Sequence, residues 1–200
     1  TSTALITYLT LYFSENFYDG MVVDSVFQAV SIGTTTGFLT SNYSNWPLFV
    51  PIMLLIAAFI GACAGSTGGG IKVSRAIILL RQGSSEITKL NHPNAVVTIK
   101  FGKKSLDPRV SESVWGFFAV YVATFLIILM FLLSQSNDFL TAFSAVGATL
   151  NNLGPGLGAV SENYKEITDG SKLALCIAML LGRLEIFTLL LLFTPAFWRN

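Results

Sequence analysis

The sequence predicts an all-α integral membrane protein built from repeated units of helix, short pore helix, irregular filter segment and helix. The 200 residues are 52% hydrophobic and 12% charged, with a mean hydropathy of +0.65, which excludes an ordinary soluble domain. Two apolar segments are too short to cross a bilayer, and each ends in irregular, glycine-containing sequence. The two irregular motifs lie 117 positions apart, which indicates an internal repeat.

The first repeat is predicted within residues 1–60. Residues 1–14 are apolar but shorter than the ~20 residues of a spanning helix, and we interpret them as the outer half of a helix that begins upstream. Residues 24–32 predict a half-length helix with Asp24 as its N-cap, and the motif TTTGF follows at 34–38. Residues 48–60 then predict a strongly apolar helix.

The connection to the second repeat begins with the Gly-rich sequence GACAGSTGGG at residues 61–70, which interrupts that apolar helix. An apolar pattern resumes at 71–80. Residues 82–110 are polar and predict a loop, in which the alternating residues 94–101 predict one strand of a short hairpin.

The second repeat opens with residues 114–133, an uninterrupted apolar run that predicts a spanning helix. Residues 139–150, capped by Asp138, predict another half-length helix, which ends in NNLGPGLG at 151–158. A final apolar run at 173–193 is long enough to span a bilayer. Aligning residues 27–37 with 143–154 requires one gap and matches their terminal glycines.

The distribution of charge predicts the orientation of these segments. Eight of the twelve Lys and Arg residues fall between Lys72 and Arg109, so the positive-inside rule places that segment in the cytoplasm and both irregular motifs on the outer side. Seven of the eleven acidic residues lie near the motifs, where they would concentrate cations. Ordinary polar loops are the alternative explanation for these acids.

Both irregular motifs suit a cation filter. Extended backbone can replace the hydration shell of a cation with carbonyl oxygens, and glycine adopts the dihedral angles that this requires. The short helix before each motif also points the negative end of its dipole at the ion. The candidate ligands are the backbone carbonyls of Thr34, Thr35, Thr36 and Gly37 in the first motif and of Asn151, Asn152, Leu153 and Gly154 in the second. Each motif taken alone also fits an ordinary extracellular loop.

The Gly-rich sequence at residues 61–70 predicts a gate. It does not match a phosphate-binding loop, because Ile71 separates Gly70 from Lys72. Flexible backbone at the middle of a membrane could swing across a conduction path, and a simple packing kink is the alternative. The candidate gate residues in this loop are Gly65, Ser66, Thr67, Gly68, Gly69 and Gly70.

Arg183 is a second candidate gate residue, near the middle of the last apolar run. A charge at that depth costs about 2.5–3.5 kcal/mol on insertion scales, so it should face a pore or a partner. Facing a pore, it would form a barrier to cations. The alternative is a structural ion pair with a carboxylate of another helix. Glu185, two residues further along the same helix, is poorly placed to pair with Arg183.

Four motifs together, SIGTTTGF, CAGSTGGGIKVSR, NNLGPGLG and GRLEIFTLLLLFTPAFWR, resemble the C-terminal half of TrkH-type subunits in the Trk/Ktr/HKT superfamily of potassium transporters. The resemblance implies a pseudo-fourfold, potassium-channel-like pore of four helix–pore–helix repeats. Residues 1–81 would be the third repeat, with its first helix truncated, and residues 111–200 the fourth. It also implies that K⁺ is the transported ion, that Gly37 and Gly154 are filter glycines, that 61–70 is the gating loop, and that Arg183 faces the pore.

The same resemblance implies the setting of the protein. We expect a multi-pass protein of the inner (plasma) membrane, surrounded by lipid, that completes its pore with an N-terminal half and forms a homodimer. A cytosolic nucleotide-binding regulatory subunit similar to TrkA is the expected protein partner. Neither an organic cofactor in this chain nor nucleic acid is expected.

Potassium uptake through a selective, channel-like pore is therefore the predicted function. The alternative is a potassium symporter coupled to H⁺ or Na⁺, which alternates access by rocking its repeats. No enzyme is predicted, because the sequence shows no nucleophile–base pair or metal cluster at helical spacing.

Overall fold

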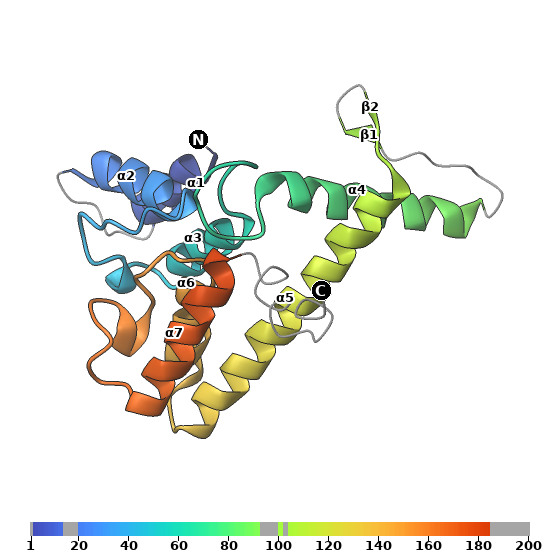
Figure 1. Cartoon of the computed structure of the whole chain (residues 1–200). Helices are drawn as coiled ribbons and strands as arrows, with labels where there is room; N and C mark the ends of the chain where they lie inside the picture. Colours follow the sequence, from blue (N-terminus) through green and yellow to red (C-terminus); the bar gives the residue numbers. More distant parts are fainter. Residues whose placement is uncertain (1, 14–19, 93–99, 102–103, 185–200) are drawn as a thin grey trace.

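The computed structural model describes residues 2–13, 20–92, 100–101 and 104–184, which form helices and one short hairpin (Figure 1). The first half of the chain contains α1 (Ser2–Phe13), α2 (Met21–Gly33), the 3-10 helix η1 (Tyr43–Asn45), α3 (Phe49–Ile60) and α4 (Val73–Asn91). The second half contains β1 (Lys100–Phe101), β2 (Lys104–Ser105), α5 (Pro108–Ser134), α6 (Phe139–Leu150), the 3-10 helix η2 (Gly158–Val160) and α7 (Asp169–Arg183).

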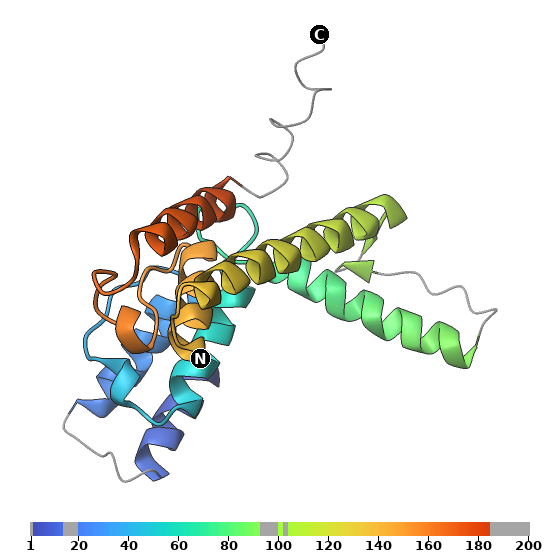
Figure 2. The same cartoon turned by 90° about the horizontal axis from the view of Figure 1, so that it is seen from below.

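The helices form two groups of three. Helices α1, α2 and α3 pack on one another, as do α5, α6 and α7, and contacts between α3 and α6 join the groups. Helix α4 and the adjoining half of α5 extend away from both groups, as the two views show (Figures 1 and 2). Each group thus consists of a short helix followed by irregular backbone, with a helix on either side in the sequence.

Helix α5 is the described helix that is long and apolar enough to cross a membrane, with a mean hydropathy of 2.6 over its most apolar window. It contains the whole predicted run 114–133 and begins six residues earlier. Pro108 stands at its first turn, and the Asp107 side chain caps it by accepting a hydrogen bond from Arg109 N–H. The shorter apolar helices are α1, α2 and α3, which precede α5 in the sequence, and α6, which follows it.

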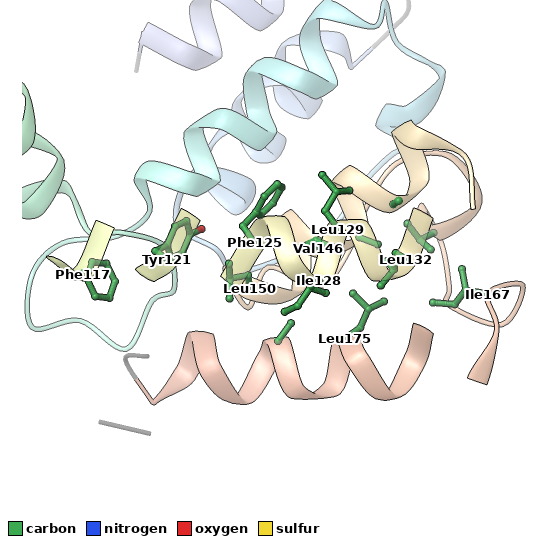
Figure 3. Close-up of a cluster of buried hydrophobic side chains, with 14 residues drawn as sticks. Phe117, Tyr121, Phe125, Ile128, Leu129, Leu132, Val146, Leu150, Ile167 and Leu175 are labelled. Carbon is green, nitrogen blue, oxygen red and sulfur yellow. The ribbon is translucent and has the colours of Figure 1, made fainter. Parts of the chain in front are cut away.

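Helix α6 is the most deeply buried element and forms the centre of the core. Its small residues Ala142, Ala145 and Ala148 are fully buried, so neighbouring helices approach its backbone closely. Figure 3 shows the large side chains around it, among them Phe125 of α5 and Leu175 of α7. Because the second filter motif begins directly after α6, this packing fixes where that motif starts.

Two predicted helix starts have different outcomes. Asp138 caps α6 as predicted, since its carboxylate accepts a hydrogen bond from Thr141 N–H at 3.1 Å. Hydrogen bonds from the Thr141 hydroxyl and, to a smaller extent, from Thr141 N–H lower the pKa of Asp138. The prediction for Asp24 is wrong. Helix α2 begins at Met21, after Gly20 with φ 93°, and Asp24 lies in its first turn. An acid there still favours the helix through its dipole.

The predicted loop over residues 82–110 is also wrong at both ends, because α4 continues to Asn91 and α5 begins at Pro108. Packing on α5 explains the longer helix. The Ser111 hydroxyl donates a hydrogen bond to the Gln82 side chain, and Ser85 is buried. A hairpin is present, with Lys100 opposite Ser105 in β1 and β2. Most of the predicted strand 94–101, like the predicted helix beyond residue 184, lies outside the described residues.

Candidate functional site

The first predicted filter segment (residues 34–37, called the first filter segment below) reverses the chain sharply at the end of α2. Thr36 N–H donates to the Ser31 carbonyl at 2.8 Å, which ends the helix in a tight turn. Thr35 has a left-handed backbone with φ 57°, and Gly37 has φ 84°. For a β-branched residue the left-handed conformation is unfavourable by about 1–2 kcal/mol. The surrounding structure therefore holds Thr35 in an unusual conformation.

The second filter segment (residues 151–154) repeats this geometry 117 positions later. Leu153 N–H donates to the Ala148 carbonyl at 2.8 Å, Asn152 has φ 52°, and Gly154 has φ 104°. These residues correspond one by one to those of the first segment at a constant offset. The filter segments and the last turn of each short helix therefore match without a gap, whereas α2 has 13 residues and α6 has 12.

The two filter segments lie directly against each other. A Cβ atom at Gly37 would lie 2.0 Å from the carbonyl oxygen of Leu153, a distance at which no side chain fits. Beyond the first segment, the Tyr43 hydroxyl donates to the Gly156 carbonyl at 2.9 Å. The Leu153 side chain is buried in a cluster with residues of α2 and α3. The structure thus brings the predicted ligands from both repeats to one place.

One filter carbonyl has a protein partner that sequence reasoning missed. The Tyr164 hydroxyl donates to the Gly154 carbonyl oxygen at 2.6 Å. Burial raises the pKa of Tyr164 to about 12, so the hydroxyl keeps its proton at neutral pH. A carbonyl oxygen has two lone pairs, so this bond orients the Gly154 carbonyl and leaves one lone pair for another donor or a cation.

The start of the second filter segment is also held from α5. The Tyr121 hydroxyl donates to Asn151 Oδ1 at 2.7 Å, and Asn151 is fully buried. Within the part of the chain that the structure describes, the side-chain nitrogens of Asn151 and Asn152 are buried without a hydrogen-bond partner. Tyr121 lies on an apolar face of a spanning helix, so no local pattern in the sequence indicated this role.

The loop predicted as a gate (residues 61–70, called the gating loop below) projects from the chain, and its two ends meet. Ile71 N–H donates to the Phe59 carbonyl at 2.9 Å, and Val73 N–H donates to the Ala62 carbonyl at 3.2 Å. A Cβ atom at Gly61 would lie 2.3 Å from the Gly69 carbonyl oxygen, so the ends approach each other closely. Helix α3 therefore leads into α4 across a short junction from which the loop projects.

The structure places Gly69, one of the six loop residues that the sequence proposed as a gate, against both filter segments. Gly69 N–H donates to Thr35 Oγ1 at 2.9 Å, and a Cβ atom at Gly69 would overlap the Asn151 carbonyl oxygen at 1.7 Å. Ser66 bonds within the loop, to the Cys63 carbonyl. Gly70, the last of the six candidate gate residues, lies where the chain returns to α3 and α4.

Arg183, at the end of α7, reaches the same loop. Its guanidinium Nη1 donates to the Thr67 carbonyl oxygen at 2.5 Å. The sequence offered a pore barrier or an ion pair with a carboxylate, and the partner in the structure is a backbone carbonyl. Gly182 beside it is closely packed, because a Cβ atom there would lie 2.0 Å from the Leu150 carbonyl oxygen. The last turn of α7 thus presses on the end of α6 while Arg183 holds the loop.

Two hollows border the loop. One, of about 240 Å³, is lined by Lys72, Arg75 and Tyr121. The other, of about 640 Å³, is lined by the three threonines of the first filter segment, Thr34, Thr35 and Thr36. Residues 66–69 and Arg183 line both hollows, so they lie between the two spaces. Among the described residues no group of three His, Cys, Asp or Glu side chains could hold a metal ion, and the oxygens at this site are carbonyls and hydroxyls.

Comparison with known proteins identifies the family. The model of a family described as "TrkH: Cation transport protein" matches residues 10–200. The chain belongs to the TrkH family. Two relatives are named Trk system potassium uptake protein TrkH. The protein from Vibrio parahaemolyticus is 53% identical over 176 residues, which is 88% of this chain and 36% of the relative. The protein from Escherichia coli K12 is 48% identical over 198 residues, which is 98% of this chain and 41% of the relative.

A solved structure agrees with this assignment to the TrkH family. The crystal structure of the potassium transporter TrkH from Vibrio parahaemolyticus matches with a TM-score of 0.91 and 48% identity, over 99% of this chain and 43% of that chain. The predicted fold class, a helical membrane protein of repeated pore-helix units, is confirmed by this likeness. The chain spans about two fifths of the length of the TrkH proteins that it matches.

Proposed function

We propose that this TrkH-family chain supplies two of the four pore repeats of a selective, channel-like K⁺ uptake protein. Residues 1–81 are the proposed third repeat and residues 111–200 the fourth, with residues 82–110 between them on the cytoplasmic side. One observation carries the proposal: two filter segments with the same backbone conformation meet at Gly37 and Leu153. The relatives' names, which refer to potassium uptake, support the choice of ion.

Selectivity in this proposal comes from backbone oxygens. A K⁺ ion gives up its water only where a ring of carbonyl oxygens replaces it on several sides. Residues 34–37 and 151–154 supply oxygens from two sides, and two further repeats would supply the others. The hydrogen bond from Tyr164 to the Gly154 carbonyl supports the proposal, because it holds one of these oxygens in a fixed direction.

The proposed gate is the loop at residues 65–70 together with Arg183. The loop lies against the filter segments at Gly69 and between two hollows, where it would obstruct an ion path. Arg183 supports the obstruction in two ways, because it holds the Thr67 carbonyl and brings a positive charge that repels K⁺. Opening requires the loop to leave its contacts with both filter segments.

The proposed setting rests on the charge distribution and on the resemblance of the chain to TrkH-type subunits. The basic segment 72–109 faces the cytoplasm and the filters face outward, in the inner membrane. The projecting arm of α4, the hairpin and the start of α5 would then lie at or near the cytoplasmic surface, where a nucleotide-binding subunit of the TrkA type would act (Figures 1 and 2). We further propose that the complete protein is a homodimer.

The test is K⁺ uptake by liposomes that contain the complete protein. We expect downhill K⁺ uptake well above that of empty liposomes, a clear preference over Na⁺, and no dependence on a gradient of H⁺. A strict requirement for an H⁺ or Na⁺ gradient would instead favour a coupled symporter with alternating access. Equal uptake in empty and protein-containing liposomes would remove the proposal altogether.

Replacing Tyr164 by Phe in the complete protein should weaken the preference for K⁺ over Na⁺. The change removes only the hydroxyl that orients the Gly154 carbonyl. A single hydrogen bond contributes about 0.5–1.5 kcal/mol, so the selectivity ratio should fall by about 2- to 12-fold. Tyr12 on α1 is half exposed, so Tyr12→Phe is the matched control. An unchanged ratio for Tyr164→Phe would show that this bond does not shape the filter.

A further inference from the structure

Thr35 combines an unfavourable backbone with an unusual side-chain contact. Its φ of 57° is a conformation that a β-branched residue rarely adopts, yet the residue is buried, with 9% of its surface exposed. Its hydroxyl does not bond to a neighbour in the sequence. It accepts a hydrogen bond at 2.9 Å from the backbone N–H of Gly69, 34 residues away in the gating loop.

Asn152, the counterpart of Thr35 in the other repeat, shares the backbone conformation of Thr35 but not its hydrogen bond to the loop. Asn152 has almost the same φ, 52°, so the left-handed turn belongs to both filter segments. The Asn152 side-chain nitrogen, however, is buried without a hydrogen-bond partner. The shared turn therefore does not by itself produce a bond to the loop, and only at Thr35 does it carry a hydroxyl to Gly69.

Besides the bond to Thr35, Gly69 is held by one main-chain bond within the loop, because its carbonyl accepts a hydrogen bond from Ala62 N–H at 3.5 Å. Four of the last six residues of the loop are Gly65, Gly68, Gly69 and Gly70, which offer no side chains for packing. The loop touches the second filter segment where Gly69 abuts the Asn151 carbonyl, a contact between an acceptor oxygen and a carbon that fixes distance but supplies no conventional hydrogen bond. On the Thr67 side the guanidinium of Arg183 holds a carbonyl. Thr35 and Arg183 thus hold neighbouring parts of the loop from two different elements.

We propose that Thr35 is a positioning residue for the gate: its hydroxyl latches the gating loop to the first filter segment and keeps the loop closed. This inference rests on the proposed function. It assigns the Thr35 side chain a role distinct from the ion-ligand role predicted for its carbonyl. The Thr35–Gly69 bond also couples the gate to the filter. The loop cannot leave without breaking this bond, and a distorted turn at Thr35 would release the loop.

The test compares four variants of the complete protein in liposomes under conditions that keep the pore closed. Thr35→Val keeps the shape and removes the hydroxyl. Thr35→Gly also removes the hydroxyl, and glycine adopts a φ of 57° without strain. This variant therefore tests the latch even if Thr35→Val fails to fold. Thr35→Ser keeps the hydroxyl. Thr88→Val, on α4 and remote from the site, is the matched control, since its hydroxyl bonds within its own helix.

Loss of the latch should raise the closed-state K⁺ leak by about 2- to 12-fold in the valine and glycine variants, as expected for one hydrogen bond. The serine variant should restore the leak to the wild-type level. A wild-type leak in Thr35→Val and Thr35→Gly would overturn the latch. So would a leak in Thr35→Ser as high as that in Thr35→Val, because the hydroxyl would then not hold the loop.

The two proposals fail in distinguishable ways. If wild-type protein takes up no K⁺ above empty liposomes, the proposed pore function fails and the latch fails with it. If wild-type protein conducts K⁺ selectively while the Thr35 variants behave like it, only the latch is overturned.

Discussion

Gly37→Ser in the complete protein is expected to cost most of its preference for K⁺ over Na⁺. A Cβ atom at this position would lie 2.0 Å from the carbonyl oxygen of Leu153, which is itself a proposed ligand. The serine would also have to adopt φ 84°, where side chains are disfavoured by about 1–2 kcal/mol. Either the first segment or the second must move, so we expect the ratio of K⁺ to Na⁺ uptake to fall by about 5- to 30-fold or more.

The matched control for this substitution is Gly33→Ser, four residues earlier at the end of α2. A Cβ atom there meets nothing within 4 Å, and its φ is not in the left-handed region. The ratio should be measured in liposomes for both variants and for wild-type protein at equal protein content. Wild-type selectivity in a well-expressed Gly37→Ser protein would exclude the close contact of the two segments as the basis of selectivity.

Arg183→Ala should raise the K⁺ flux of the complete protein. The substitution removes the hydrogen bond to the Thr67 carbonyl and a positive charge next to both hollows. Hydrogen bonds from charged groups contribute about 1.5–3 kcal/mol, so a loop held by this bond should open about 10- to 100-fold more often. Flux should be followed as K⁺ uptake into liposomes, with the amount of folded protein checked by its elution as a single species.

Arg183→Lys divides the two effects, because lysine keeps the charge but lacks the planar guanidinium. A flux close to wild type would assign the barrier to the charge, whereas a flux close to that of Arg183→Ala would assign it to the hold on Thr67. Unchanged or reduced flux in folded Arg183→Ala would contradict both roles.

The sequence predicted the helices that rely on local signals and missed those that rely on packing. Helix α6 follows from its cap Asp138 and its apolar run, and both predictions are confirmed. The polar half of α4 carries Gly83 and several serines, which favour a loop by composition. It is helical where it packs on α5, through contacts such as that of Ser111 with Gln82, which are not visible in the local pattern.

For the candidate site, too, the sequence predicted the features that depend on local backbone and missed the contacts that depend on packing. Glycine placement and the 117-residue repeat predicted irregular backbone at residues 34–37, 61–70 and 151–154, because these features depend on backbone conformation. The side chains that orient them, Tyr43, Tyr121 and Tyr164, lie far from their partners in the sequence or in segments without a motif. A tyrosine in a loop or on an apolar helix face has many uses, so only the fold reveals which carbonyl or amide it reaches.

The two ends of the gating loop meet, so the proposed gate would move as a flap about a fixed hinge. Main-chain bonds from Ile71 to Phe59 and from Val73 to Ala62 hold its base. Once the bonds from Thr35 and Arg183 to the loop break, the residues between would swing while α3 and α4 stay where they are. Ion flow would then be switched by a rearrangement of a few residues, without rigid-body movement of the helices that carry the filter. Shortening the tip should accordingly spare the scaffold and alter only how often the path is obstructed.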